Sequence, residues 1–236
     1  MLTERDIDWL RFMGRFPLLT AQHLMVYAGK SKAIVSRRLI EMTNAGYVEV
    51  ALVTINGGRR LYSLSNEGRK QIGLPGKASG IRIGSAEHDS LVAWWFMQET
   101  QKFPDSEFLT DREIRSHERS VERNGLAPRY AVPRGGVNKG LMFPDFVRVE
   151  GDKFLAYELE YSPKYLKRTI ENMQVYAGSA DVAGVLYAAP GRLLPVVTEA
   201  AKKVNGDRQM VGLKPKIWVK QIWEGGDYGF VAEAVN

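Results

Sequence analysis

The chain has 236 residues, 44% of them hydrophobic and 25% charged, which is the composition of an ordinary globular protein. Lys and Arg outnumber Asp and Glu by 33 to 27, and the resulting formal net charge of +6 is compatible with a polyanionic partner. The absence of cysteine excludes disulfides, thiolate metal sites and cysteine nucleophiles. No apolar run reaches the roughly 20 residues that span a bilayer, and the acidic N-terminus is unlike a signal peptide. A cytoplasmic protein without a membrane partner is therefore expected.

The sequence predicts an α+β protein of two domains. Residues 1–72 alternate helical patterns with one strand–turn–strand pattern. Residues 73–86, GLPGKASGIRIGSA, are rich in Gly and Ser and indicate a linker. Residues 87–236 are expected to form a second unit, in which helices and strands follow one another.

The first domain is predicted to be a winged helix-turn-helix. The Ala28-Gly29 pair indicates a tight turn between the second and third helices, Gly46 ends the third helix, and Asn56-Gly57-Gly58 is a hairpin turn signal. The expected elements are, in order, a helix capped by Thr3, a helix capped by Thr20, a helix from Ser31 to Asn44, strands over 47–54 and 60–64, and a short helix over 66–72.

The third helix carries most of the residues expected to contact DNA. Val35, Leu39 and Met42 fall on one face and should pack on the first two helices. The other face presents cations near the N-terminal end, which enters the major groove in this motif. Two arginines beside the hairpin turn can reach a minor groove or the backbone. The candidate DNA-binding residues are Lys30, Lys32, Ser36, Arg37, Arg38, Arg59 and Arg60. A merely solvated charged face and a protein-interaction module are the alternatives.

The second unit is predicted to contain a small mixed sheet flanked by helices. Gly151-Asp152 indicates a turn between two strands, and Pro163 suits the first turn of a helix. Residues 104–140 show no clear pattern. The expected elements are a helix over 87–103, strands over 141–149 and 153–161, a helix from 163 to about 177, a strand over 182–188, a helix over 193–205 and a strand over 217–223.

Carboxylates on the two strands around the Gly151-Asp152 turn suggest chemistry. Asp145 and Glu158 can lie side by side there, and Glu160 shares a face with Glu158. Such groups can hold Mg²⁺ for phosphodiester cleavage. Pro144-Asp145 and Glu158-Leu159-Glu160 resemble the PD-(D/E)xK nuclease signature, except that Glu160 replaces the lysine. Lys164 could fold back into the site. The structural alternative is that the glutamates pair with Lys164, Lys167 or Arg168, or are simply solvated at a rim.

Along much of its length the chain resembles the replication-relaxation family of plasmid and mobile-element proteins, which includes relaxosome-associated mobilisation proteins. The resemblance implies a winged helix attached to a nuclease-like domain, used in plasmid replication, transfer or its control. No catalytic residue is carried over, because Glu160 occupies the lysine position. The matching segments are Leu2-Thr3-Glu4-Arg5-Asp6, Leu19-Thr20-Ala21-Gln22-His23-Leu24, Ser36-Arg37-Arg38-Leu39, Leu64-Ser65-Asn66-Glu67-Gly68, Glu87-His88-Asp89, Pro144-Asp145, Glu158-Leu159-Glu160-Tyr161-Ser162 and Tyr176.

Two main functions are left open by the sequence. The first is a protein that binds double-stranded DNA without a cofactor, in transcriptional or replication control or as a relaxosome accessory factor, with a relaxase or a second copy as candidate partners. The second is a Mg²⁺-dependent endonuclease in which Asp145 and Glu158 bind the metal. Glu160 at the usual lysine position is an argument against this second function. A third possibility is an adaptor that binds only proteins.

Overall fold

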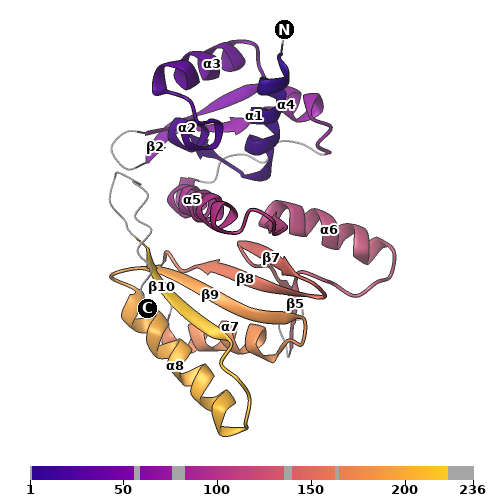
Figure 1. Ribbon diagram of the computed structural model, residues 1–236, viewed down its shortest axis with the longest axis vertical. Coiled ribbons are helices and arrows are strands. Elements are labelled where there is room, and N and C mark those ends of the chain that lie inside the picture. Colours follow the sequence, from indigo (N-terminus) through magenta and orange to yellow (C-terminus); the bar gives the residue numbers. More distant parts are fainter. Residues whose placement is uncertain (1, 56–58, 76–82, 136–139, 163–164, 223–236) are drawn as a thin grey trace. The chain divides into compact units, whose positions relative to one another are not determined.

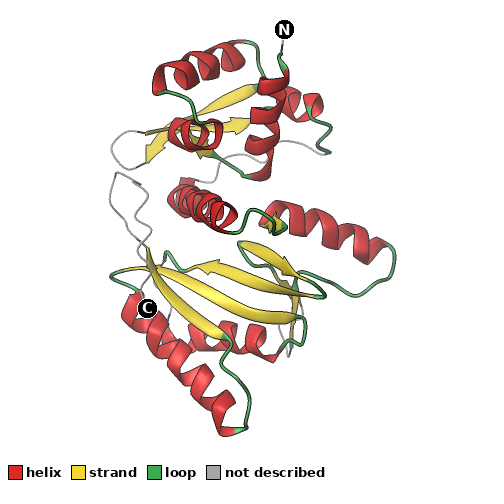
Figure 2. Cartoon of the chain, in the orientation of Figure 1, coloured by secondary structure: helices red, strands yellow, loops and turns green. Residues whose placement is uncertain are grey.

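The computed structural model describes residues 2–55, 59–75, 83–135, 140–162 and 165–222. The chain forms two compact units, Met1–Lys102 and Phe103–Asn236. Both combine helices with a β-sheet, so the expected α+β class is confirmed (Figures 1 and 2).

The first unit contains a three-stranded antiparallel sheet and several helices. The strand order is β1-β3-β2, so that the two-residue strand β1 pairs with β3. The helices and strands before the linker follow the predicted order, with β1 as an addition. They are α1 (Glu4–Arg15), β1 (Leu19–Thr20), α2 (Ala21–Ala28), α3 (Lys32–Asn44), β2 (Val48–Ile55), β3 (Arg59–Leu64) and α4 (Asn66–Gln71).

Local signals explain where the first helices begin and end. Thr3 and Asp6 form a reciprocal capping box at the start of α1. Gly29 ends α2 with a φ of 59°, and Gly46 follows α3 with a φ of 79°, a left-handed conformation that favours glycine. The tight turn predicted before α3 and the helix end predicted at Gly46 are therefore present.

Helix α5 (Ala86–Lys102) groups with the first unit, whereas the sequence analysis assigned residues 87–236 to the second. The described part of the linker includes a short 3₁₀ helix, η1 (Ile83–Ser85). Ala86 packs with Leu18, Ile55 and Leu61 in one buried cluster, and α5 contacts α2 and β1. Helix α5 thus packs on elements of the first unit, and this compact unit ends at Lys102.

Gly68 in α4 is required by a close approach of the backbone. A Cβ added there would lie 2.1 Å from the Tyr47 carbonyl oxygen, and that oxygen is held by the Ser65 amide at 3.1 Å. We expect Gly68→Ala to lower the free energy of unfolding by roughly 1–3 kcal/mol, measured by urea denaturation. The control is Gly206→Ala, where an added Cβ meets nothing within 4 Å and a gain of roughly 0.5–1 kcal/mol is expected. Wild-type stability in the Gly68 variant would contradict the predicted clash.

The second unit is built on a five-stranded mixed sheet in the order β10-β9-β8-β7-β4. Strands β8, β9 and β10 are parallel, and β7 and β4 are antiparallel to their neighbours. Strands β5 and β6 form a separate two-stranded antiparallel sheet. The elements are β4 (Phe108–Thr110), α6 (Asp111–Arg123), β5 (Val132–Arg134), β6 (Gly140–Met142), β7 (Phe146–Glu150), β8 (Lys153–Leu159), α7 (Leu166–Gly178), β9 (Val182–Pro190), α8 (Leu194–Met210) and β10 (Ile217–Ile222).

Helices α7 and α8 pack against each other and cover one face of this sheet (Figure 1). The core beneath them includes Met173, Tyr176, Val185, Val197 and Ala200, all 0–1% exposed. The predicted order from β7 to β10 is confirmed. Strand β4, from the region without a clear pattern, pairs with β7 at the edge opposite β10. None of the helices within the described ranges is both long and apolar enough to cross a membrane.

Helix α6 lies in the region for which the sequence analysis assigned no structure. It begins with a capping box in which Thr110 accepts from the Glu113 amide while the Glu113 carboxylate accepts from the Thr110 amide at 2.8 Å. A Thr followed three residues later by Glu is a recognised start signal, so this helix could have been found. Its high content of charged residues obscured the apolar periodicity, because only Ile114 and Glu118 are buried.

Candidate functional site

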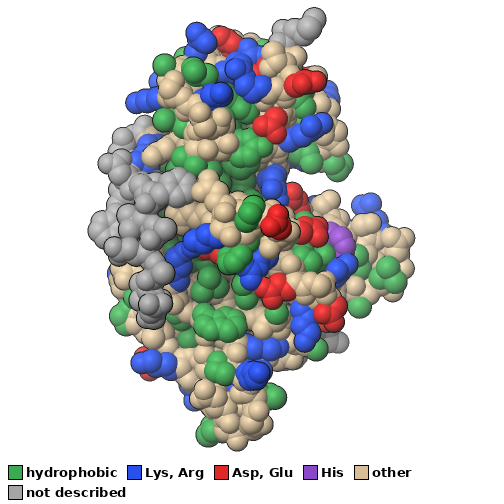
Figure 3. Space-filling view, in the orientation of Figure 1, with side chains coloured by type: hydrophobic (Ala, Val, Ile, Leu, Met, Phe, Trp, Pro, Cys, Tyr) green, Lys and Arg blue, Asp and Glu red, His purple; other side chains and the backbone are tan. Residues whose placement is uncertain are grey.

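Helix α3 presents cations on one face and buries apolar residues on the other. Val35, Leu39 and Met42 are 0–1% exposed, as predicted. Lys30, just ahead of the helix, and Lys32 in its first turn are exposed. The Arg37 side chain is 76% exposed, with its Nε 4.0 Å from a Glu41 carboxylate oxygen. Figure 3 shows Lys and Arg side chains gathered over this part of the first unit.

Arg38 has a different environment from Arg37. Its Nε donates to Asp6 Oδ1 at 2.7 Å, and its terminal nitrogens pair with Asp6 and Glu41. The Asp6 side chain is completely buried, and that of Arg38 is 19% exposed. Arg38 therefore joins α3 to α1, a role that no local pattern in the sequence indicated.

Burial alone would raise the pKa of the Asp6 carboxyl. Hydrogen bonds from Arg38 and Thr3, together with the charge of Arg38, outweigh burial and lower the pKa to about 2. Asp6 accordingly stays ionised, and its lone pairs are used by Thr3 and Arg38.

The other predicted contact residues differ in exposure. Arg60 is exposed on β3 and lies opposite Thr54 of β2. Ser36 and Arg59 are half-buried. The turn residues Asn56–Gly58 lie outside the described residues. Among the described residues, the predicted DNA-binding cations that are exposed are therefore Lys30, Lys32, Arg37 and Arg60.

His23 is a buried histidine that links α2 to α5. Its Nδ1 accepts from the Thr20 amide at 3.0 Å, so the proton lies on Nε2, which donates to the Ser90 carbonyl oxygen at 3.0 Å. Burial lowers the pKa of His23 to about 3, and the charge of Arg59 lowers it as well, against the effect of the Ser90 hydrogen bond. The imidazole is thus neutral and structural.

The strand register in the second unit brings two of the predicted carboxylates together. Phe146 pairs with Tyr157, and the Asp145 amide donates to the Tyr157 carbonyl at 3.1 Å, which places Asp145 opposite Glu158. Asp145 Oδ2 accepts from the Leu159 amide at 2.7 Å. Glu160 is 5% exposed. Lys164, the suggested replacement for the missing lysine, lies outside the described residues.

Two buried tyrosines accompany these carboxylates. Tyr176 donates its hydroxyl to Glu158. Burial raises the pKa of both Tyr176 and Tyr187, and the negative charges of Glu158 and Asp145 raise it further. Both phenols therefore remain protonated and able to donate. Tyr176 was expected only as part of the family resemblance, and no sequence signal indicated Tyr187, because their approach depends on packing between α7 and the sheet.

The grouping of the carboxylates decides whether they can hold a metal ion. Within the described part of the chain, no three His, Asp or Glu side chains are grouped closely enough to hold an ion. One carboxylate oxygen of Asp145 accepts a hydrogen bond from the Leu159 amide, and one of Glu158 accepts from the Tyr176 hydroxyl. Two carboxylates on neighbouring strands can contribute to a Mg²⁺ site only with further ligands from water or substrate.

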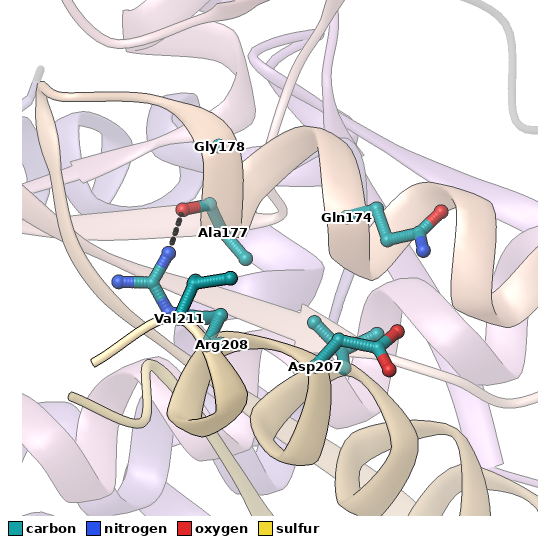
Figure 4. A pocket seen from close by; sticks show the side chains of 7 residues that line it. Gln174, Ala177, Gly178, Asp207, Arg208 and Val211 are labelled. Carbon is teal, nitrogen blue, oxygen red and sulfur yellow. Dashed lines mark hydrogen bonds between the residues drawn. The ribbon is translucent and has the colours of Figure 1, made fainter. Parts of the chain in front are cut away.

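A shallow pocket of about 220 Å³ lies between the ends of α7 and α8 (Figure 4). Arg208 points to the end of α7 and donates to the Ala177 carbonyl at 2.7 Å. This hydrogen bond satisfies a carbonyl at the C-terminus of α7. Among the described lining residues, one side chain is acidic (Asp207), one is basic (Arg208), and none is a nucleophile. The lining residues are Gln174, Ala177, Gly178, Val204, Asp207, Arg208 and Val211.

The cationic face of α3 and the carboxylate pair of β7 and β8 are thus the two candidate sites, one in each unit. Comparison of the chain with protein-family models, with curated proteins and with solved structures finds no match.

Proposed function

We propose that the first unit is a winged helix-turn-helix that binds double-stranded DNA. Helix α3 is the recognition helix, α2 is the helix that precedes it, and the β2–β3 hairpin is the wing. The order of helices and strands, and the pairing of β1 with β3 beside that hairpin, support this proposal. In such motifs the N-terminal part of the recognition helix contacts the bases in the major groove.

The exposed cations on α3 carry the proposal. Lys30, Lys32 and Arg37 lie in or before the first half of the helix, while its apolar side is fully buried. Lys and Arg can neutralise phosphates, and Arg can bond a guanine edge with two nitrogens. Arg60 on the wing adds a further cation. Arg38 has a structural role in this proposal, because its guanidinium donates hydrogen bonds to Asp6 and Glu41.

The resemblance to the replication-relaxation family suggests the setting. We propose that the protein acts on a plasmid or mobile element, in transcriptional or replication control or as an accessory factor of the relaxosome. A relaxase and a second copy of the chain are candidate partners. The second unit, proposed to be related to PD-(D/E)xK nucleases, would then serve in DNA or partner contact.

Loss of the proposed interface should weaken DNA binding strongly. We expect Lys32→Ala/Arg37→Ala/Arg60→Ala to reduce affinity for duplex DNA by roughly 10- to 100-fold and to lower the salt slope by about 3, because three phosphate contacts are removed. Fluorescence anisotropy across a series of salt concentrations measures both quantities.

The matched control removes three exposed cations from the second unit, Lys202, Lys203 and Lys214. It carries the same net charge as the triple variant, so that general electrostatic attraction is reduced equally. Equal affinity of the triple variant and this control would reject α3 and the wing as the reading surface. The absence of any salt-dependent binding by the wild-type chain would favour the protein adaptor.

A Mg²⁺-dependent endonuclease is the second candidate, supported by the register that sets Asp145 opposite Glu158. These two side chains would hold the metal, which would activate water for phosphodiester cleavage. Incubation with supercoiled plasmid and Mg²⁺ or Mn²⁺ tests it. Cleavage by the wild type that disappears in Asp145→Ala would establish the nuclease, and intact plasmid in every reaction would reject it.

A further inference from the structure

We propose that α6 in the second unit forms an additional contact surface for the DNA backbone, through Arg115, Arg119 and Arg123. The identity of the ligand rests on the proposed function of the first unit. The surface itself is defined by the geometry of α6 and by the environment of its arginines.

The arginines of α6 occupy one side of the helix. At about 100° per residue, positions 115, 119 and 123 fall within an arc of about 80°. The buried residues Ile114 and Glu118 lie outside this arc. The result is a row of guanidinium groups along one helix face.

The rotation of α6 about its axis is fixed by the buried carboxylate of Glu118. Its oxygens accept from the Arg129 amide at 3.0 Å and from the Tyr130 amide at 2.6 Å. Glu118 is 4% exposed, and Ile114 is fully buried in the core of the second unit. These contacts hold the arginine row away from the core.

The charges in this row are only partly compensated. Arg115 pairs with Asp111 at 2.8 Å, and its guanidinium lies 4.1 Å from the centre of the Phe143 ring. Arg119 Nε donates to the Arg115 carbonyl oxygen at 3.0 Å. Among the described residues, neither Arg119 nor Arg123 forms an ion pair with a carboxylate. Both are exposed.

A regular polyanion fits this row better than a compact acidic ligand. From Arg115 to Arg123 the helix rises by about 12 Å at 1.5 Å per residue. Phosphates on one strand of duplex DNA recur every 3.4 Å or so along its axis, so several of them can face a row of this length. Arginine forms paired hydrogen bonds with phosphate, and the row needs no base contact to bind.

The test compares two double variants of the full chain that carry equal net charge. Arg119→Gln/Arg123→Gln removes two cations of the row, and Lys202→Gln/Lys203→Gln removes two exposed cations of α8. Binding to a random-sequence duplex of roughly four helical turns is measured by anisotropy at several salt concentrations. We expect the α6 variant to bind roughly tenfold more weakly at low salt, with a salt slope lower by about 2, and the α8 variant to stay near wild type.

Thermal melting first establishes that both variants are folded. An α6 variant that binds like the α8 variant overturns the α6 surface, whatever the result for the first unit. If the α3 and wing variant retains binding while the α6 variant loses it, the proposed function of the first unit fails and the α6 surface stands. If polyglutamate competes for the protein as effectively as DNA does, and the α6 changes abolish that competition, the surface binds acidic proteins instead of DNA.

Discussion

Replacing Arg38 by alanine is expected to lower the free energy of unfolding by up to about 3–5 kcal/mol, because it removes the hydrogen-bonded counter-charge of the buried Asp6 carboxylate and leaves only Arg5, whose terminal nitrogen lies 3.8 Å from Asp6 Oδ1. Asp6 is fully buried, and Arg38 supplies two of its hydrogen bonds. The adjacent Arg37 is 76% exposed, so Arg37→Ala should change stability by less than about 0.5 kcal/mol. Chemical denaturation of the two variants gives the comparison directly.

A double-mutant cycle separates loss of the ion pair from loss of packing. Adding Asp6→Asn to Arg38→Ala removes the buried charge that has lost Arg38, so the double variant should be more stable than Arg38→Ala alone. The pKa of Asp6 is lowered to about 2, so its stabilising contribution is present above pH 4 or so and is lost as the pH falls toward 2. Equal stabilities of the Arg37 and Arg38 variants would refute the structural role of Arg38.

Acidification below pH 6.5 is expected to destabilise the first unit through His23, by up to about 1.4 kcal/mol for each pH unit. The unfolded imidazole takes up a proton near its ordinary pKa of 6.5, whereas in the folded protein the pKa is lowered to about 3. The unfolded state therefore binds more protons between these values. Stability is full above pH 6.5 and falls as the pH is lowered.

The variant His23→Asn isolates this effect. It should be less stable than the wild type at pH 7, since the hydrogen bond to the Ser90 carbonyl is lost. Its free energy of unfolding should also fall less steeply between pH 6.5 and about 5, where most carboxylates remain ionised. Identical slopes for wild type and variant, or an NMR titration of His23 near pH 6.5, would show that the imidazole is accessible to protons in the folded state.

The parts of the fold that the sequence predicted correctly are those determined by neighbouring residues. Capping residues and glycines with positive φ defined the first three helices, and the Gly151 turn set β7 beside β8, which brought Asp145 opposite Glu158. Helix α7 begins at Leu166, later than the expected start at Pro163. The extent of α8 to Met210 was underestimated, because its last turns carry polar residues.

The features that sequence analysis missed depend on contacts between distant segments. The Arg38–Asp6 pair spans 32 residues and the His23–Ser90 hydrogen bond spans 67. An arginine beside Arg37 on a basic helix looks like a further DNA ligand until the buried Asp6 is located. Similarly, the placement of α5 in the first unit followed from its packing, whereas a linker rich in glycine and serine suggested an earlier boundary.

The docking of α5 determines which fragment of this protein can be studied alone. A truncation at the expected linker would remove Ser90, leaving His23 Nε2 without its acceptor, and would uncover Phe16, whose ring lies 5.3 Å from that of Phe96. Such a fragment should aggregate or lose cooperativity. An autonomous N-terminal piece for crystallisation or NMR with DNA must instead extend to Lys102.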